Sequence, residues 1–196
     1  YLDELSGWWR GNANFNKAHY QYTTVPLTYS PDYKRPMLLR SATTWEAIKK
    51  LSDDLRAENK YIFANKTPDK DLYYTTLVDG MGTEIAALNN GQYYAPSISN
   101  FRYWRTYAYQ KPFCLLVNTD FDVFDHEMMD KYMQRALAFG VFVSPFDSYS
   151  DQKTYYTSPN MYYERDRDLF QKYMPVMKKV SQAGWEPVTR THSDND

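Results

Sequence analysis

Tyr1-Leu2-Asp3-Glu4 opens the chain and is followed at once by Gly7 and the pair Trp8-Trp9. These first residues are typical of the end of a buried strand, and that strand ends on two carboxylates. A chain that starts inside a strand is expected to be a piece of a larger protein. The remaining segments are therefore interpreted as continuing a sheet that begins before Tyr1.

Four further apolar segments follow the opening one, and each is interpreted as a short strand. They begin at Tyr61, Leu77, Phe113 and Val141. Apolar residues at helical spacing separate most of them. The expected helices run from Thr43 to Asn59, Ile98 to Tyr109, Asp125 to Phe139, and Asn160 to Gln182. Short strands that alternate with helices and are apolar on both faces favour a parallel sheet with covered faces.

Several short stretches of sequence predict specific local structures. Residues 6–40 carry no steady period and are expected to form a long loop. The run Thr43-Thr44-Trp45-Glu46 resembles a capping box at a helix start. Asn89-Asn90-Gly91 predicts a turn, and Pro175 is expected to kink the last helix or to break it in two.

Together these segments predict an α/β fold, namely part of a (β/α)8 barrel with roughly strands four to eight. Residues 1–184 would form this part of the barrel. Residues 185–196 would begin a following segment, such as a β-sandwich domain. A doubly wound sheet is the alternative, and no glycine-rich phosphate loop follows any strand to support it.

The composition argues against nucleic acid and membranes as partners. The net charge is −1, and no basic stripe marks a nucleic-acid surface. No apolar run reaches the roughly 20 residues that span a bilayer. Aromatic residues make up 18% of the chain, with Tyr 20 and Trp 5. That content is typical either of a groove that stacks sugar rings or of a Tyr-rich surface, and the composition does not choose between them.

The sequence indicates neither a cofactor nor a metal site. The histidines His19, His126 and His192 lack zinc-ligand spacing, and we expect His126 to be solvated in the first turn of a helix. Cys114, the single cysteine, lies in an apolar run and is predicted to be a packing thiol.

The carboxyl ends of the predicted strands carry the candidate site, because barrel enzymes place their active sites there. Two carboxylates across a sugar can cut its glycosidic bond. We predict Asp3 as nucleophile or base and Glu84 as general acid, with Glu4 and Asp79 as rivals. The predicted substrate-binding residues are Trp8, Trp9, Asn65, Asn118 and Asp120.

This layout resembles (β/α)8-barrel glycoside hydrolases, especially the clan that contains the α-galactosidases. Leu2-Asp3-Glu4-Leu5 would match the nucleophile after strand four, and Asp79 or Glu84 the acid/base after strand six. The segment 184–188 resembles the exit into a following β-sandwich. The chain departs from the clan in having no Lys two residues before Asp3, which leaves Glu4 as a rival nucleophile.

The resemblance implies a glycosidase whose partner is a carbohydrate. Two other functions stay open: a catalytically inactive barrel used for carbohydrate binding or assembly, and a lyase or isomerase that uses the same strand ends. Half a barrel leaves open sheet edges, so the remainder of its own barrel or other subunits are expected partners. Among compartments, we favour the extracellular space or the secretory pathway.

Overall fold

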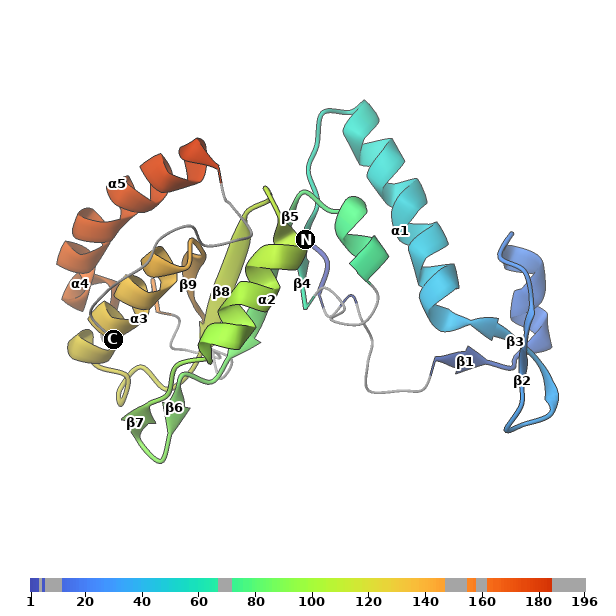
Figure 1. Ribbon diagram of the computed structural model, residues 1–196, viewed down its shortest axis with the longest axis horizontal. Helices are drawn as coiled ribbons and strands as arrows, with labels where there is room; N and C mark the ends of the chain where they lie inside the picture. Colours follow the sequence, from blue (N-terminus) through green and yellow to red (C-terminus); the bar gives the residue numbers. More distant parts are fainter. Residues whose placement is uncertain (4, 6–11, 67–71, 147–154, 158–161, 185–196) are drawn as a thin grey trace. The chain divides into compact units, whose positions relative to one another are not determined.

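The computed structural model describes residues 1–3, 5, 12–66, 72–146, 155–157 and 162–184. The chain divides into two compact units, residues 1–79 and 80–196, and each is described by itself (Figure 1). The following segment that the sequence predicts at residues 185–196 lies outside the described residues.

The first unit contains a small antiparallel sheet. β3 (Arg35–Leu39) lies between β1 (Ala13–Asn14) and β2 (Thr28–Ser30), and the 3-10 helix η1 (Lys17–Tyr22) precedes β2. The Tyr20 hydroxyl donates to the Pro36 carbonyl over 3.0 Å. The expectation of a long loop over 6–40 is therefore wrong for the described part of that range.

Helix α1 (Arg40–Ala57) begins earlier than the predicted capping box. Leu39 is its N-cap and makes no side-chain capping bond, while the Thr43 hydroxyl donates to the Arg40 carbonyl. Glu46 instead accepts the hydroxyl groups of Thr23 and Thr24 and the Thr24 N–H. These bonds lower the pKa of Glu46, and the bond from the Thr23 hydroxyl has the largest effect. The capping-box prediction is wrong, because the Glu46 carboxylate ties α1 to the segment before β2.

A parallel pairing lies at the end of the first unit. β4 (Phe63–Asn65) forms a parallel bridge between Ala64 and Leu2. Leu2 N–H donates to the Phe63 carbonyl over 2.9 Å, and Asn65 N–H donates to the Leu2 carbonyl over 2.8 Å. The opening residues thus pair in parallel with the next predicted strand, as expected. The 3-10 helix η2 (Leu72–Thr76) follows, and Tyr74 in it is buried.

The second unit has a parallel sheet in which β8 (Phe113–Asn118) lies between β5 (Gly80–Ile85) and β9 (Phe142–Phe146). In register, Met81 faces Phe113, and Cys114 faces Phe142. This confirms the α/β class and the parallel strands.

A hairpin of β6 (Leu88–Asn89) and β7 (Gln92–Tyr93) follows β5. Its turn residues Asn90 and Gly91 have φ values of 50° and 72°. Two successive positive φ values are what a two-residue type I′ turn requires, and Asn-Gly is its favoured sequence. The turn prediction at 89–91 is therefore confirmed.

Helices α2 (Ile98–Ala108) and α3 (His126–Ala138) cover one face of this sheet. Ser97 and Asp125 cap them by accepting the N–H groups of Asn100 and Met128. Trp104 of α2 stacks on Phe113 with ring centroids 5.7 Å apart. Tyr132 of α3 is buried, and its hydroxyl donates to the Leu115 carbonyl. The core of this unit therefore lies between the helices and the side chains of Phe113, Leu115 and Val117.

The last predicted helix is divided into α4 (Tyr162–Arg165) and α5 (Arg167–Ala183). The division falls at Asp166, and α5 continues through Pro175, so the proline does not break the helix. α5 packs beside α3, where the Tyr173 hydroxyl donates to Asp130 over 2.7 Å (Figure 1). Within the described ranges, no helix has both the length and the apolar character needed to cross a membrane.

Candidate functional site

In the first unit, the structure brings together two predicted site residues, Asp3 and Asn65. Asn65 Nδ2 donates to Asp3 Oδ1 over 3.0 Å, and the Tyr1 hydroxyl donates to the same oxygen over 3.2 Å. Both residues follow directly on the parallel bridge between Leu2 and Ala64. Asn65 is fully buried, whereas Asp3 is exposed. A rigid amide therefore orients a carboxylate that solvent can reach.

Asp79 has a different environment from the one that the sequence predicts. It directly precedes β5, whereas a barrel active site collects residues at the carboxyl ends of strands. Its Oδ2 accepts the Ile62 N–H over 2.9 Å, and its Oδ1 lies 3.2 Å from Arg56 Nη2. The expectation that Asp79 ends a strand is wrong, and its contacts are those of a group that fixes the backbone before β4.

In the second unit, Glu84 and Asn118 lie on the same face of the sheet. Side chains alternate along a strand, so this face carries Glu84 of β5, Cys114, Leu116 and Asn118 of β8, and Phe142 and Ser144 of β9. We call it the open face, because most of these side chains are partly exposed. Glu84 is in register with Leu116, and Asn118 is the last residue of β8. Both side chains thus lie near the carboxyl end of the open face.

Asp120 lies in the loop that follows β8 and is exposed. Its Oδ1 accepts the Asp122 N–H over 2.9 Å, and its carbonyl accepts the N–H groups of Val123 and Phe124. These bonds define a tight turn before α3. Asp120 therefore shapes the loop while it keeps a carboxylate at the surface.

Glu4, Trp8 and Trp9 lie outside the described residues, so their predicted roles stay predictions. Asp3 belongs to the first unit and Glu84 to the second, and the pairing of the two as nucleophile and acid also stays a prediction. Cys114 on the open face is partly exposed, and burial raises the pKa of its thiol to about 11. The thiol is therefore protonated near neutral pH, in keeping with packing rather than nucleophilic chemistry.

Sequence reasoning missed a polar cluster around Asp166, whose side chain is fully buried. Asp166 Oδ1 receives Arg165 Nε over 2.9 Å and lies 3.0 Å from His126 Nδ1. Oδ2 receives Arg165 Nη2 and the Tyr155 hydroxyl, both over 2.8 Å. Arg165 also donates to the carbonyls of Phe121 and Phe124. Residues 164–168 lie within the predicted helix 160–182 and are all charged, so no sequence signal marked this carboxylate as buried.

His126 is partly exposed to solvent, as the sequence predicts, but it also belongs to this cluster. Its side chain is 43% exposed, and one ring nitrogen faces Asp166. The other, Nε2, lies 3.5 Å from Oδ2 of Asp168, which is largely exposed. Burial, followed by the charge of Asp166, raises the pKa of Tyr155 far above its usual value, so its hydroxyl remains a donor.

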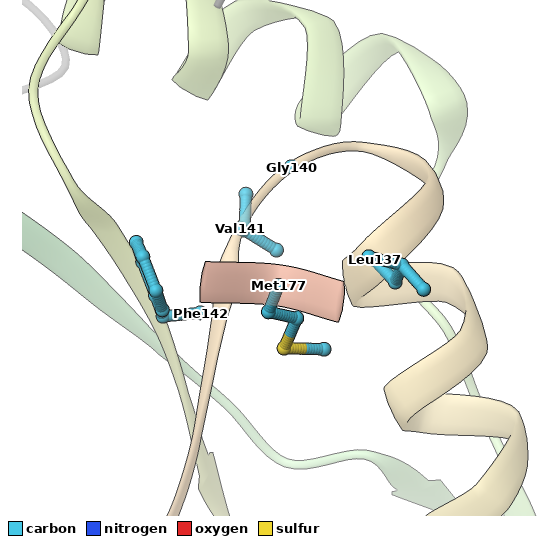
Figure 2. Close-up of a pocket in the computed structure, with 5 residues that line it drawn as sticks. All are labelled: Leu137, Gly140, Val141, Phe142 and Met177. Carbon is cyan, nitrogen blue, oxygen red and sulfur yellow. The ribbon is translucent and has the colours of Figure 1, made fainter. Parts of the chain in front are cut away.

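A small apolar pocket lies where α3 ends and β9 begins, against Met177 of α5 (Figure 2). Leu137, Gly140, Val141 and Phe142 complete its lining, and it has no room for a water-sized molecule. It is a packing defect and not a ligand site. Among the residues that the structure describes, no group of three or more His, Cys, Asp or Glu side chains is placed to hold a metal ion.

Comparison with protein-family models, with curated proteins and with solved structures finds no match for this chain. The resemblance to the α-galactosidase clan therefore stays a prediction. Two local arrangements are candidates for function: the Asp3–Asn65 pair in the first unit, and the carboxyl end of the open face in the second.

Proposed function

We propose that this chain is part of a carbohydrate-active (β/α)8 barrel that hydrolyses a glycosidic bond with paired carboxylates. The observation that carries the proposal is the 3.0 Å hydrogen bond from Asn65 to Asp3, just after two segments that pair in parallel. Such a carboxylate and amide, side by side where parallel strands end, suit the anomeric centre and a hydroxyl group of a sugar.

The sheet of the second unit supports the proposal, because helices pack on one of its faces and the candidate polar residues lie on the other. α2 and α3 pack on the face that carries Phe113 and Leu115, and the open face carries Glu84 and Asn118. A barrel has its helices outside and turns the other face of each strand inward. A doubly wound sheet, the alternative, has helices on both faces.

In the proposed reaction, Asp3 attacks the anomeric carbon or activates water, and Glu84 protonates the leaving oxygen. Asn65 holds Asp3 in one orientation, so less rotational freedom is lost when the substrate binds. Asn118 offers an amide to a sugar hydroxyl from the end of β8. The separation of the two carboxyl groups would decide between retention and inversion of the anomeric centre.

The experiment uses the full-length protein that contains this chain, assayed on a panel of aryl glycosides. Asp3→Asn and Glu84→Gln should each lower kcat by roughly 10²- to 10⁴-fold with little change in Tm, the range for loss of an acid–base group. Glu58→Gln is the matched control, because Glu58 is exposed and pairs with the exposed Lys60 in a surface salt bridge. Unchanged turnover in both test variants would exclude the assignment.

A second candidate function is a catalytically inactive module that binds carbohydrate. Exposed rings in the first unit favour it: Tyr22, Tyr29 and Tyr33 are 79%, 59% and 64% exposed. Flat aromatic faces of this kind can stack on sugar rings. Glycan binding without turnover on any glycoside, lost when Tyr29 and Tyr33 are changed to Ala, would favour this function over hydrolysis.

A further inference from the structure

The geometry points to a second functional group in the second unit, and we propose that His126 and Asp166 form a proton-transfer dyad. In this dyad Asp166 fixes the imidazole ring, and Nε2 of His126 accepts a proton from water or from the hydroxyl group of an uncharged ligand. The proposal does not depend on Asp3 or Glu84, and it places a second acid–base group after the carboxyl end of β8.

The hydrogen bonds of Asp166 decide which nitrogen of His126 carries the proton. Arg165 and Tyr155 are donors, and an ionised carboxylate can only accept. The 3.0 Å contact of His126 Nδ1 with Oδ1 is therefore an N–H donated to the carboxylate. In the neutral ring, the proton on Nδ1 leaves Nε2 with a free electron pair.

Burial makes this arrangement rigid. Asp166 is fully buried and each of its oxygens receives two donors, so it has little freedom to turn away from His126. The His126 side chain is 43% exposed, so a small molecule can reach the ring. A buried carboxylate that orients a partly exposed imidazole is the arrangement that general bases use to hold the productive tautomer.

The surroundings of Nε2 select the class of ligand. Asp168 lies 3.5 Å from it on α5, and Asp125 caps the same helix that His126 begins. The guanidinium of Arg165, which contacts Asp166 on the far side of the ring, is occupied by that carboxylate and two carbonyls. Asp166 and Asp168, the carboxylates in contact with the two ring nitrogens, disfavour an anionic ligand and favour a neutral hydroxyl donor.

The proton-transfer step balances without a further reactant. The ligand O–H bond breaks, its electron pair stays on oxygen, and the proton binds Nε2. The resulting imidazolium donates from Nδ1 to Asp166 and faces Asp168 through Nε2. The proton then leaves to the product or to water, which restores the neutral ring.

Two measurements on the full-length protein test the dyad. Long-range ¹H–¹⁵N NMR of the neutral ring should show Nδ1 protonated and Nε2 bare in His126. Asp166→Asn should weaken this preference. Tyr155→Phe should leave the preference for a proton on Nδ1 intact, because that change keeps the contact between His126 and Asp166. It is also the variant that should disturb folding less. A ring protonated on Nε2 in the unchanged protein would overturn the proposal.

The second measurement follows hydrolysis of 4-nitrophenyl acetate, a neutral ester. Nε2 takes a proton from water as the water oxygen bonds to the carbonyl carbon, and 4-nitrophenolate leaves as its C–O bond breaks. His126→Gln should lower the protein-dependent rate several-fold, and Asp166→Asn should lower it in part. His19→Gln should not lower the rate, because His19 lies in the first unit beside Asn14 and Asn16. Equal rates with and without His126 would refute the dyad and leave the proposed glycosidase unaffected.

Discussion

Asn65 donates its side-chain N–H to the carboxylate of Asp3 across 3.0 Å, although 62 positions separate the two residues in the sequence. The parallel bridge between Leu2 and Ala64 creates this contact, because each residue directly follows one partner of the bridge. Leu5 N–H also donates to the Asn65 carbonyl, so the backbone on both sides of Asp3 is held. The pair is thus a consequence of strand pairing and does not depend on a bound ligand.

Replacing Asn65 tests how much this pair contributes to stability. Asn65→Ala should lower the free energy of unfolding by about 1–2 kcal/mol, because a buried polar side chain and its bonds are lost. Asn65→Asp should cost more at neutral pH, since it sets a second carboxylate against Asp3. Urea denaturation gives both values, with the exposed Asn100→Ala as control. A smaller loss for Asn65→Asp than for Asn65→Ala would contradict the contact.

The Asp79 carboxylate should matter for folding more than its partner Arg56 does. Asp79→Asn loses a charged acceptor for the Ile62 N–H and should cost about 1 kcal/mol. Arg56→Gln removes a surface ion pair whose arginine side chain is 44% exposed, together with a long 3.4 Å bond to the Thr76 carbonyl, and should cost about 0–0.5 kcal/mol. Thermal and urea unfolding of both variants measure this order. If Arg56→Gln proved the more harmful, the backbone contact would not be the main role of Asp79.

Features encoded by local signals were predictable from the sequence. α3 begins after Asp125 and ends before Gly140, as its cap and stop residues predict, because both signals act within one helical turn. The apolar run that begins at Phe113 predicts a strand, and the structure has one over Phe113–Asn118. The Asn90-Gly91 turn was found because few residue types tolerate two positive φ values in succession.

Features created by contacts between distant residues could not be predicted. Glu46 reads as a capping residue, yet it bonds Thr23 and Thr24, which lie more than 20 positions away. The strands at 13–14 and 28–30 are too short to show a period, and they exist because β3 pairs with both. Asp166 interrupts the last helix where its side chain enters a buried cluster, and Pro175 does not.

The candidate site residues also differ in whether local sequence signals mark them. The sequence correctly places Asn65 and Asn118 at the ends of apolar strands, because the apolar runs mark those strands. It misplaces Asp79, because the strand begins one residue after it. His126 and Asp166 are 40 positions apart, and neither lies in a motif that could have linked them.

Two neighbouring arginines provide a test of the buried cluster. Arg165→Met leaves the Asp166 carboxylate buried without its cation and should lower the free energy of unfolding by about 2–3 kcal/mol. Arg167→Met removes a cation of the same kind that is half exposed and pairs with Glu164, and should change stability by less than about 0.5 kcal/mol. Chemical denaturation of the two variants gives the comparison. Similar losses in both would mean that burial of Asp166 does not set the cost.

The contact between α3 and α5 should make stability depend on pH in a defined direction. The hydrogen bond from Tyr173 is the main cause that lowers the pKa of Asp130. A carboxyl group whose pKa is lower in the folded than in the unfolded chain, where it is about 3.9, stabilises the fold above that value. That contribution is lost as the pH falls through the folded-state pKa, because both states then bind the proton.

Tyr173→Phe removes the hydroxyl and keeps the buried ring, which is 6% exposed in the native protein. The variant should be less stable by about 1 kcal/mol at neutral pH, the usual loss for one hydrogen bond to a charged group that remains partly solvated. The difference from the unchanged protein should shrink as the pH falls below about 4, where protonation weakens the acceptor. Urea denaturation between acidic and neutral pH measures it, with the exposed Tyr109→Phe as control. If the difference in free energy of unfolding between the two proteins stays constant across this pH range, the hydroxyl of Tyr173 does not act through the charge of Asp130.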